Sequence, residues 1–338
     1  MKYLFAISLL LFCSNVFGQN TDSAIFYFNK GIEEKKANRY LTATQAFSKS
    51  IKFNPTNADS YLENGMVNIL MKRIDVARDN FIKVHELQPS NKIALHELMN
   101  IYYNYRQYAK AIEMANKCNS CPSADRLIGM SYFKQQQYMA AEKSLVTALA
   151  KNKNDADAMY ALARTYLEME EYAKAMPLLE KAVKMDTSKT SWMYELGLLY
   201  YTQSIYKDAV ISFKAAAAKG YFQSPDFKEN LGYALLYTGG YEEGERLLLE
   251  LLAQRPGNQY ILRDMADIFY RKKEYDKSLE YCDKLMGINP KDWKALYQAG
   301  LNFQKKGNNA KGQYMCDLAI KNDPTLESLR RKKEMMGL

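Results

Sequence analysis

TSWMYELGLLYYTQSIYKDAVISFKAAAAKGYFQS, residues 190–224, is the stretch that decides the fold. Its first apolar stripe has the spacing i, i+3, i+4, i+7 of one helical face and consists of Met193, Leu196, Gly197 and Tyr200. After the polar residues 202–204, a second stripe follows at helical spacing and consists of Tyr206, Ala209, Phe213 and Ala216. Because neither helix can bury its stripe alone, the stretch predicts a helical hairpin.

The same spacing returns along the chain with a period of 34 residues. Nine copies fit one frame, of which the third is four residues short: 24–57, 58–91, 92–121, 122–155, 156–189, 190–224, 225–258, 259–292 and 293–326. Five copies carry proline at the same point of the repeat, at Pro55, Pro89, Pro256, Pro290 and Pro324. Hairpins repeated in one register predict a solenoid, which grows along one axis without a single central core.

The pattern, with Gly31, Tyr40, Ala43, Phe47 and Pro55 in the first copy, resembles the tetratricopeptide repeat (TPR) family over residues 24–326, about nine tenths of the chain. The resemblance implies an all-α fold, a right-handed superhelix of stacked helix pairs. It also implies that the first helix of each pair lines the concave surface. We expect residues 327–338 to form a capping helix on the last repeat.

The N-terminal sequence predicts a secretory signal peptide over residues 1–18. Lys2 precedes the short apolar run YLFAISLLLF, and small Gly18 stands before Gln19. A run of ten is too short to span a bilayer, which takes about 20 residues, but it suits a signal peptide with cleavage after Gly18. Phe12 before Cys13 argues against a lipoprotein signal. We therefore expect an exported, periplasmic or extracellular bacterial protein with no transmembrane segment in the mature chain.

The formal net charge is +9, and hydrophobic residues make up 48% of the chain. Basic and acidic residues are interspersed, which indicates a solvated surface rather than a nucleic-acid footprint. One basic cluster, residues 330–333, lies in the expected cap. It either keeps the end of the solenoid soluble or contacts an anionic lipid or acidic partner.

Four cysteines remain after the expected cleavage. Cys282 and Cys316 occupy the position of Phe213 in their repeats, which predicts two buried free thiols. Cys118 and Cys121 lie where the third repeat is truncated, and an oxidising compartment favours a local disulfide between them. A reduced pair and a redox-active pair are the alternatives; the redox reading lacks the strand and helix context that such motifs have.

Catalytic and cofactor motifs are missing from the sequence. Its two histidines, His85 and His96, have no metal-ligand or triad spacing, and no glycine-rich phosphate loop is present. We predict a protein that is not an enzyme and that uses neither a cofactor nor a metal.

The family resemblance marks certain positions of each first helix as concave. Tyrosine and arginine are frequent there, and both often carry binding energy at interfaces. The predicted groove residues are His96, Tyr103, Arg126, Phe133, Tyr160, Arg164, Tyr194, Tyr201, Tyr233, Arg263, Tyr270 and Tyr297.

The sequence thus predicts a protein-protein interaction scaffold of the bacterial cell envelope that binds a peptide or partner protein along this groove. Components of envelope secretion, motility or outer-membrane assembly are candidate partners. The alternative is a glycan- or peptidoglycan-associated binding protein whose tyrosines face sugar rings. Nucleic acid is not an expected partner, because the export signal separates the chain from RNA.

Overall fold

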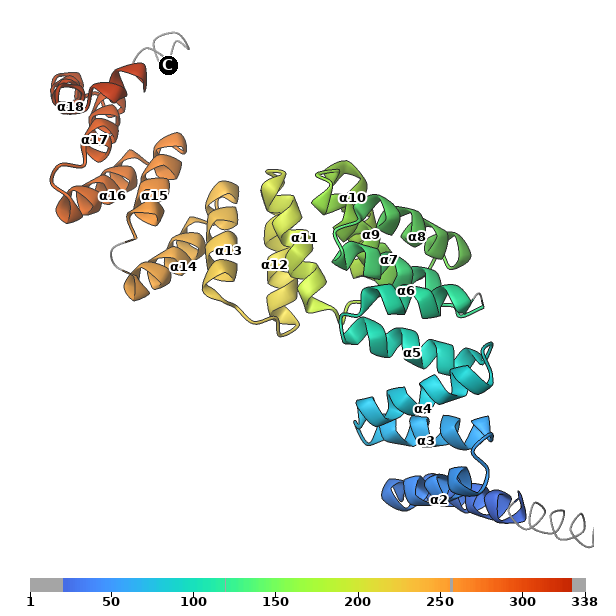
Figure 1. The fold of residues 1–338 in the computed structure, drawn as a ribbon. Helices are drawn as coiled ribbons and strands as arrows, with labels where there is room; N and C mark the ends of the chain where they lie inside the picture. The colour runs from blue at the N-terminus through green and yellow to red at the C-terminus, as the bar shows by residue number, and fades with distance from the viewer. Residues whose placement is uncertain (1–20, 119, 256–257, 330–338) are drawn as a thin grey trace, which may run out of the picture. The chain divides into compact units, whose positions relative to one another are not determined.

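The predicted all-α repeat fold is confirmed in the computed structural model, which describes residues 21–118, 120–255 and 258–329 (Figure 1). The chain divides into two units, Met1–Met185 and Asp186–Leu338, and each is taken by itself below. The predicted signal peptide and the basic cluster at 330–333 lie outside the described residues. No helix in the described ranges has the length and apolarity that a membrane span requires.

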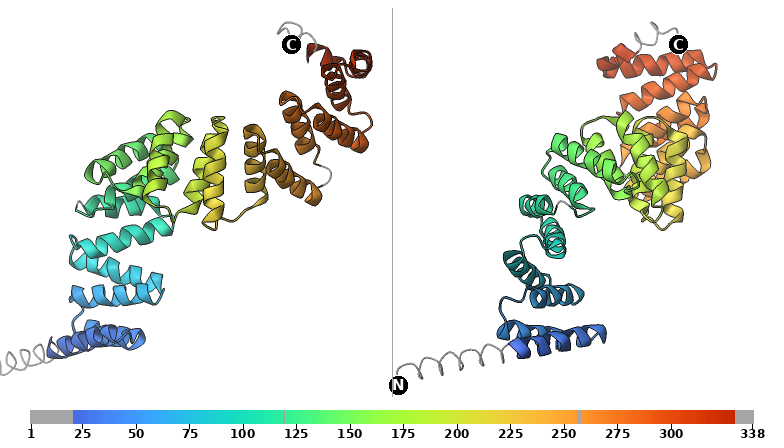
Figure 2. Two further views of the ribbon diagram at one scale, coloured as in Figure 1. Left: turned by 180° about the vertical axis from the view of Figure 1, so that it is seen from behind. Right: turned by 90° about the vertical axis from the view of Figure 1, so that its right-hand side faces the viewer.

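The first unit consists of successive helical hairpins, each packed on the next (Figures 1 and 2). Its elements are a helical segment at 21–36, α2 (Tyr40–Phe53), α3 (Ala58–Leu70), α4 (Ile74–Leu87), α5 (Lys92–Asn104), α6 (Tyr108–Lys117), α7 (Ala124–Lys134), α8 (Tyr138–Lys151), α9 (Ala156–Glu168) and α10 (Tyr172–Met185).

The second unit continues the same plan. Its elements are α11 (Thr190–Thr202), α12 (Tyr206–Ala218), α13 (Pro225–Thr238), α14 (Tyr241–Gln254), α15 (Gln259–Arg271), α16 (Tyr275–Ile288), α17 (Trp293–Lys305), α18 (Asn309–Asn322) and the 3-10 turn η1 (Pro324–Leu326). Leu326 of η1 is buried against the last hairpin. Of the expected cap at 327–338, residues 327–329 are described and are helical.

A glycine facing a large side chain holds most hairpins together. In the hairpin of α11 and α12, a Cβ added to Gly197 would lie 2.5 Å from the Phe213 ring, and Gly65 meets Phe81 in the same way at 2.7 Å. Both phenylalanines are fully buried. Because glycine has no side chain, it leaves the space that the ring sixteen residues later fills. This explains why the two positions repeat together.

The third repeat reaches the same packing with the sizes exchanged. Met99 stands at the repeat position of Gly65 and Gly197, and Ala115 stands at the position of Phe81 and Phe213; both are buried. The large residue comes from the first helix and the small one from the second, so the space between α5 and α6 is still filled. The repeat pattern did not predict this exchange, because it specifies a residue type at each single position and not the summed volume of a pair.

Each turn within a hairpin contains one residue in the left-handed region. Seven of these residues are not glycine, among them Lys72 (φ 58°) and Ser204 (φ 60°), whereas Gly239 has φ 92°. The backbone N–H of the following residue bonds back five positions, as from Arg73 to Asn68 at 2.8 Å. This is the hydrogen bond of a Schellman motif, which ends the first helix of the hairpin.

The truncated third repeat has a short second helix. Helix α6 has ten residues, whereas the second helices of the other hairpins have 13 or 14. Cys118 and Cys121 follow it and are paired as a disulfide, with their Cα atoms 5.4 Å apart. The chain then enters α7 at Ala124, two residues later than the start of the repeat frame.

Replacing both Cys118 and Cys121 with serine is expected to cost the free energy of unfolding no more than about 2 kcal/mol, because the closed loop is very short. Urea unfolding followed by circular dichroism measures this, with thiol titration of the unfolded wild type to establish oxidation. A loss well above that limit would mean that the pair fixes more than the end of α6.

Cys282 and Cys316 are buried and form no disulfide, as predicted. Burial raises the pKa of the Cys282 thiol to about 12, so this cysteine stays protonated at neutral pH. Both sulfurs occupy the space that a phenylalanine ring fills in the first, second and sixth repeats.

Candidate functional site

The predicted groove residues of the first unit all lie on the first helix of a hairpin and are half-buried. Helix α5 carries His96 and Tyr103, α7 carries Arg126 and Phe133, and α9 carries Tyr160 and Arg164. Each side chain therefore keeps an accessible part. In the second unit, Tyr194, Tyr201, Arg263 and Tyr270 are half-buried in the same way.

Two predicted groove residues are buried instead and offer little open surface. Tyr233 is 8% exposed and Tyr297 is 5% exposed. The Tyr233 hydroxyl donates a hydrogen bond to Asp264 at 3.0 Å, and burial followed by the charge of Asp264 raises the pKa of Tyr233. Tyr233 packs with residues of the following repeat, and Tyr297 packs with the last helix and with Leu326 of η1.

Two of the predicted arginines join consecutive repeats. Arg126 donates to Asp155 at 2.7 Å, and Arg263 donates to Asp292 through two nitrogens at 2.6 and 3.2 Å. Each aspartate stands 29 residues after its arginine and caps the first helix of the next hairpin, α9 or α17. These guanidinium groups are thus already neutralised by carboxylates, and their main contribution is to the stacking of repeats.

Asp292 has two competing influences on its pKa. Burial acts to raise it, but hydrogen bonds from Arg263 and from the backbone N–H groups of Ala295 and Lys294 outweigh burial, and the pKa of Asp292 is lowered. A carboxylate with a lowered folded-state pKa stabilises the fold above its unfolded pKa and loses that contribution as the pH falls through the folded value.

Replacing Asp292 with alanine is therefore expected to cost about 2 kcal/mol at pH 7, through the lost helix cap and the lost charged hydrogen bonds. The difference from wild type should shrink as the pH falls below 3.8, the ordinary pKa of aspartate, and through the lowered pKa of the folded state, because protonation removes the same interactions. Urea unfolding at several pH values measures it. Asp283→Ala, an exposed position on α16, is the control, and an equally large loss there would contradict the assignment.

Aromatic pairs recur at the turn of the hairpins. An aromatic ring near the end of the first helix contacts a tyrosine at the start of the second, five residues later. The ring centroids lie 5.5 to 5.8 Å apart in the pairs Tyr103–Tyr108, Phe133–Tyr138, Tyr201–Tyr206 and Tyr270–Tyr275. Each of these four predicted groove rings is therefore held in place by a tyrosine of its own hairpin.

The hydroxyl groups of these tyrosines are held neutral. Burial raises the pKa values of Tyr103, Tyr201 and Tyr270. A neutral phenol can both donate and accept a hydrogen bond, which suits the amide groups of a peptide.

The remaining predicted residues have partners of their own. Arg164 lies 5.4 Å from the centre of the Phe133 ring, a cation-π contact. Tyr194 stacks on Tyr221 at 4.8 Å and accepts a hydrogen bond from Asn230 at 3.2 Å. His96 lies 3.4 Å from Glu97 and from Asn100, both on its own helix. The described residues contain no cluster of histidine, cysteine or acidic groups that could hold a metal.

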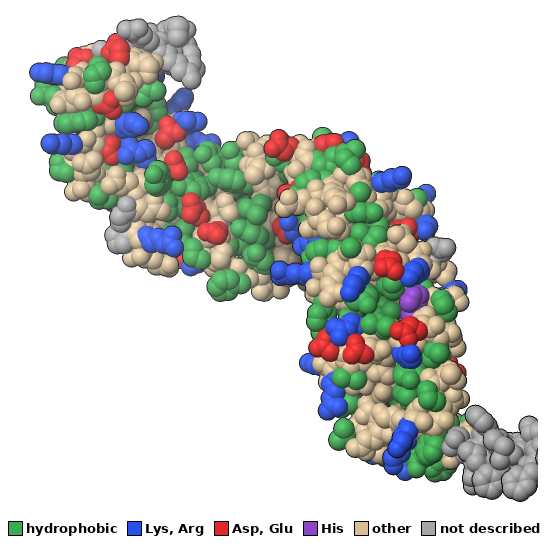
Figure 3. All heavy atoms as spheres, viewed as in Figure 1, with side chains coloured by type: hydrophobic (Ala, Val, Ile, Leu, Met, Phe, Trp, Pro, Cys, Tyr) green, Lys and Arg blue, Asp and Glu red, His purple; other side chains and the backbone are tan. Residues whose placement is uncertain are grey.

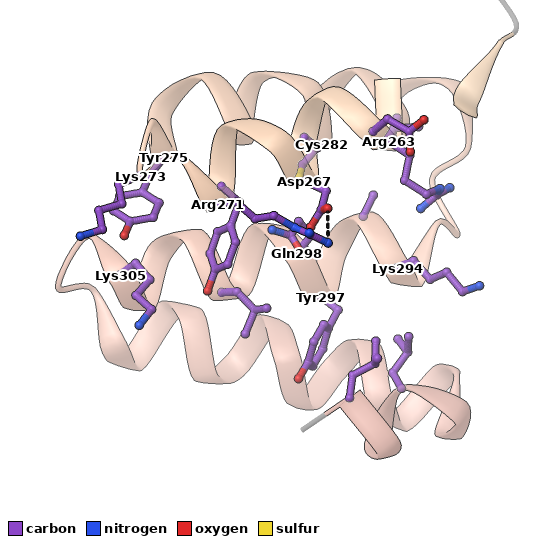
Figure 4. A pocket seen from close by; sticks show the side chains of 18 residues that line it. Arg263, Asp267, Arg271, Lys273, Tyr275, Cys282, Lys294, Tyr297, Gln298 and Lys305 are labelled. Atoms are coloured by element: carbon purple, nitrogen blue, oxygen red, sulfur yellow. Dashed lines mark ion pairs between the residues drawn. The ribbon is translucent and has the colours of Figure 1, made fainter. Parts of the chain in front are cut away.

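The second unit also contains a pocket of about 720 Å³ (Figure 4). Three predicted groove residues, Arg263, Tyr270 and Tyr297, line it, together with residues that sequence reasoning missed. Helices α15, α16 and α17 line it together with residues of the cap. Its apolar lining comprises Ala266, Cys282, Leu285, Ala295, Leu301, Leu326 and Leu329, and its charged lining comprises Arg263, Asp264, Asp267, Arg271, Lys273, Lys294 and Lys305. Lys294 stands at a repeat position that the family resemblance marks as concave, whereas Lys273 and Lys305 do not, so the repeat frame gave no signal for those two.

Charges elsewhere on the visible surface are mixed rather than segregated. Figure 3 shows lysine and arginine side chains scattered among aspartate and glutamate over that face, as the sequence indicates. The concentration of cations at the pocket is thus a local feature.

Comparison with known proteins identifies the repeats. Two family models described as tetratricopeptide repeat match residues 132–193 and 230–292. These two segments, the first mostly in the first unit and the second in the second unit, are therefore similar to tetratricopeptide repeats.

Curated relatives are distant and longer. The chain is 26% identical to the TPR repeat-containing protein MJ1428 of Methanocaldococcus jannaschii over 89% of this chain and 53% of the relative. It is 27% identical to the protein O-mannosyl-transferase TMTC1 of Homo sapiens over 48% of this chain and 18% of the relative. The chain thus spans about half or less of the length of these relatives, and the activity named for TMTC1 is not carried over.

Solved structures resemble parts of the chain. MamA from strain AMB-1 covers 48% of this chain and 92% of its own length, at 21% identity and a TM-score of 0.44. YrrB, described as a TPR protein with an unusual peptide-binding site, covers 65% of this chain and 97% of its own length, at 20% identity and a TM-score of 0.34.

Proposed function

We propose that this protein is a non-enzymatic interaction scaffold that binds an extended peptide or a partner protein on the first helices of its repeats. The observation that carries the proposal is the recurrence of half-buried aromatic and cationic side chains on those helices, in both units. Rings held in place and neutral hydroxyl groups provide rigid contact area and hydrogen bonds at little cost in conformational entropy.

A cellular setting in the bacterial envelope is part of the proposal and rests on the sequence of residues 1–18. Export places the mature chain in the periplasm or outside the cell, where components of secretion, motility or outer-membrane assembly are available as partners. Mass spectrometry of the protein from fractionated cells tests this. Gln19 at the N-terminus of the envelope-associated form is the expected result, and full-length chain retained in the cytoplasm would contradict it.

A protein partner is favoured over a glycan by the packing of the rings. Sugar binding uses open aromatic faces, but in the four recurring pairs each groove ring already contacts a tyrosine. A glycan array probed with the mature protein separates the two functions: no bound glycan is expected, and specific binding of one glycan class would favour the glycan-binding alternative.

The groove is tested by affinity purification of tagged mature protein from its native envelope. One variant removes Tyr160 and Arg164 from the first unit, and another removes Tyr201 and Tyr270 from the second. Met139→Ala is the control, because this side chain is 70% exposed on a second helix. Loss of one partner with a groove variant that keeps its helical circular dichroism supports the proposal. Retention of all partners by both groove variants would overturn it.

A further inference from the structure

The pocket of the second unit combines an apolar floor with cations at its two ends. In Figure 4, Lys273, Tyr275 and Lys305 lie at one end, and Lys294 and Arg263 lie at the other. Cys282 and Gln298 lie between the ends. The distance between the two cationic ends restricts which ligands can contact both of them.

The three lysines are the available cations of this pocket. Arg271 is paired with Asp267 at 2.8 Å, and Arg263 is paired with Asp292. Lys273, Lys294 and Lys305 are exposed and have no carboxylate partner within the described part of the chain. A ligand with negative charge at each end would neutralise them without first breaking an ion pair.

The middle of the pocket favours a peptide. The Nε2 atom of Gln298 is buried and has no hydrogen-bond partner in the described structure. A buried donor left unpaired is costly, so an acceptor that reaches it, such as a peptide carbonyl oxygen, gains more than an exposed hydrogen bond would. Leu285, Leu301 and Leu326 supply the apolar surface around it.

The spacing of the ends sets the length of the segment. Lys294 and Lys305 are eleven positions apart on α17, which corresponds to about 16 Å along the helix. An extended peptide covers that distance with about five residues.

We propose that this pocket binds an extended peptide segment in which two acidic residues, about five positions apart, flank an apolar stretch. The inference rests on the proposed function and narrows it to one site and one ligand chemistry. Acidic side chains pair with the lysines at each end, the apolar residues cover the leucine floor, and a backbone carbonyl accepts from Gln298.

The test is selection of a phage-displayed library of random 12-residue peptides on the immobilised mature protein. Enriched peptides are expected to carry two acidic residues four to six positions apart around apolar residues. Enrichment of peptides without that spacing, or no enrichment, would overturn the inference.

Variants of the pocket then show whether the selected peptide binds there. Its affinity, measured by fluorescence anisotropy, should fall about 10- to 100-fold in a Lys294→Glu/Lys305→Glu variant and about 3- to 10-fold with Gln298→Met. It should stay unchanged with Lys321→Glu, an exposed lysine of α18 outside the pocket. Equal binding by all variants with intact circular dichroism would place the peptide elsewhere and reject this site.

Binding to phosphatidylglycerol vesicles tests whether the pocket contacts an anionic membrane surface instead of a peptide. Binding of vesicles that depends on Lys294 and Lys305, with no peptide selected, would assign the pocket to a membrane surface and overturn the inference. Because Tyr270 lines the pocket, the first-unit variant that lacks Tyr160 and Arg164 separates the two proposals. Failure of the phage selection, while that variant still loses a partner, would reject only the pocket. Retention of every partner by both groove variants would reject the scaffold surface itself.

Discussion

Phe213→Ala is expected to lower the free energy of unfolding of the second unit by about 3–5 kcal/mol. The ring is fully buried and fills the space that Gly197 leaves open, so its removal takes away apolar contacts and leaves a cavity. Urea unfolding followed by circular dichroism at 222 nm measures the loss, and hydrogen exchange in α11 and α12 locates it.

A double variant provides the internal control. Gly197→Met combined with Phe213→Ala copies the arrangement of Met99 and Ala115 in the third repeat. It should recover part of the loss, whereas Gly197→Met alone should destabilise because the new side chain meets the ring. A loss below about 1 kcal/mol for Phe213→Ala would show that the glycine and the ring do not form the core of the hairpin.

Gly312→Ala is expected to cost about 1–3 kcal/mol, because the new methyl group would meet backbone rather than a movable side chain. Its Cβ would lie 2.5 Å from the carbonyl oxygen of Gly300, where α17 and α18 cross. The two helices must separate to admit it. Thermal and urea unfolding of the variant measure the effect.

The matched control is Gly287→Ala, also within a helix of the second unit. No heavy atom lies within 4 Å of a Cβ added there, so the substitution should stabilise by about 0.5–1 kcal/mol through helix propensity alone. If both variants changed stability equally, the close approach at Gly300 would not be what makes Gly312 sensitive.

The fold could be predicted from the sequence because its determinants are local. Gly197 and Phe213 are sixteen residues apart and recur in register, so one hairpin read correctly gives the others. The third repeat was harder, because Met99 and Ala115 preserve the filled volume while exchanging the residue types that a motif requires.

The candidate site was less predictable, because exposure depends on neighbours that a motif does not specify. Tyr233 and Tyr297 occupy groove positions of the frame but are buried, and Arg126 and Arg263 lie at such positions but pair with the caps of the following repeats. The lysines of the pocket come from a turn and from two ends of α17. No period connects them, and only the folded chain brings Lys273 close to Lys305.

The packing of glycine and ring within one repeat also has an evolutionary consequence. Since the glycine and the ring that fills it belong to the same repeat, a gene duplication or an unequal crossing-over that adds or removes 34 residues carries both halves of the contact together. Only the links between repeats, such as Arg263 with Asp292, must be matched anew. An array of this kind can change its length by recombination more readily than it can change a single core position, and its repeats can diverge in pairs of compensating substitutions.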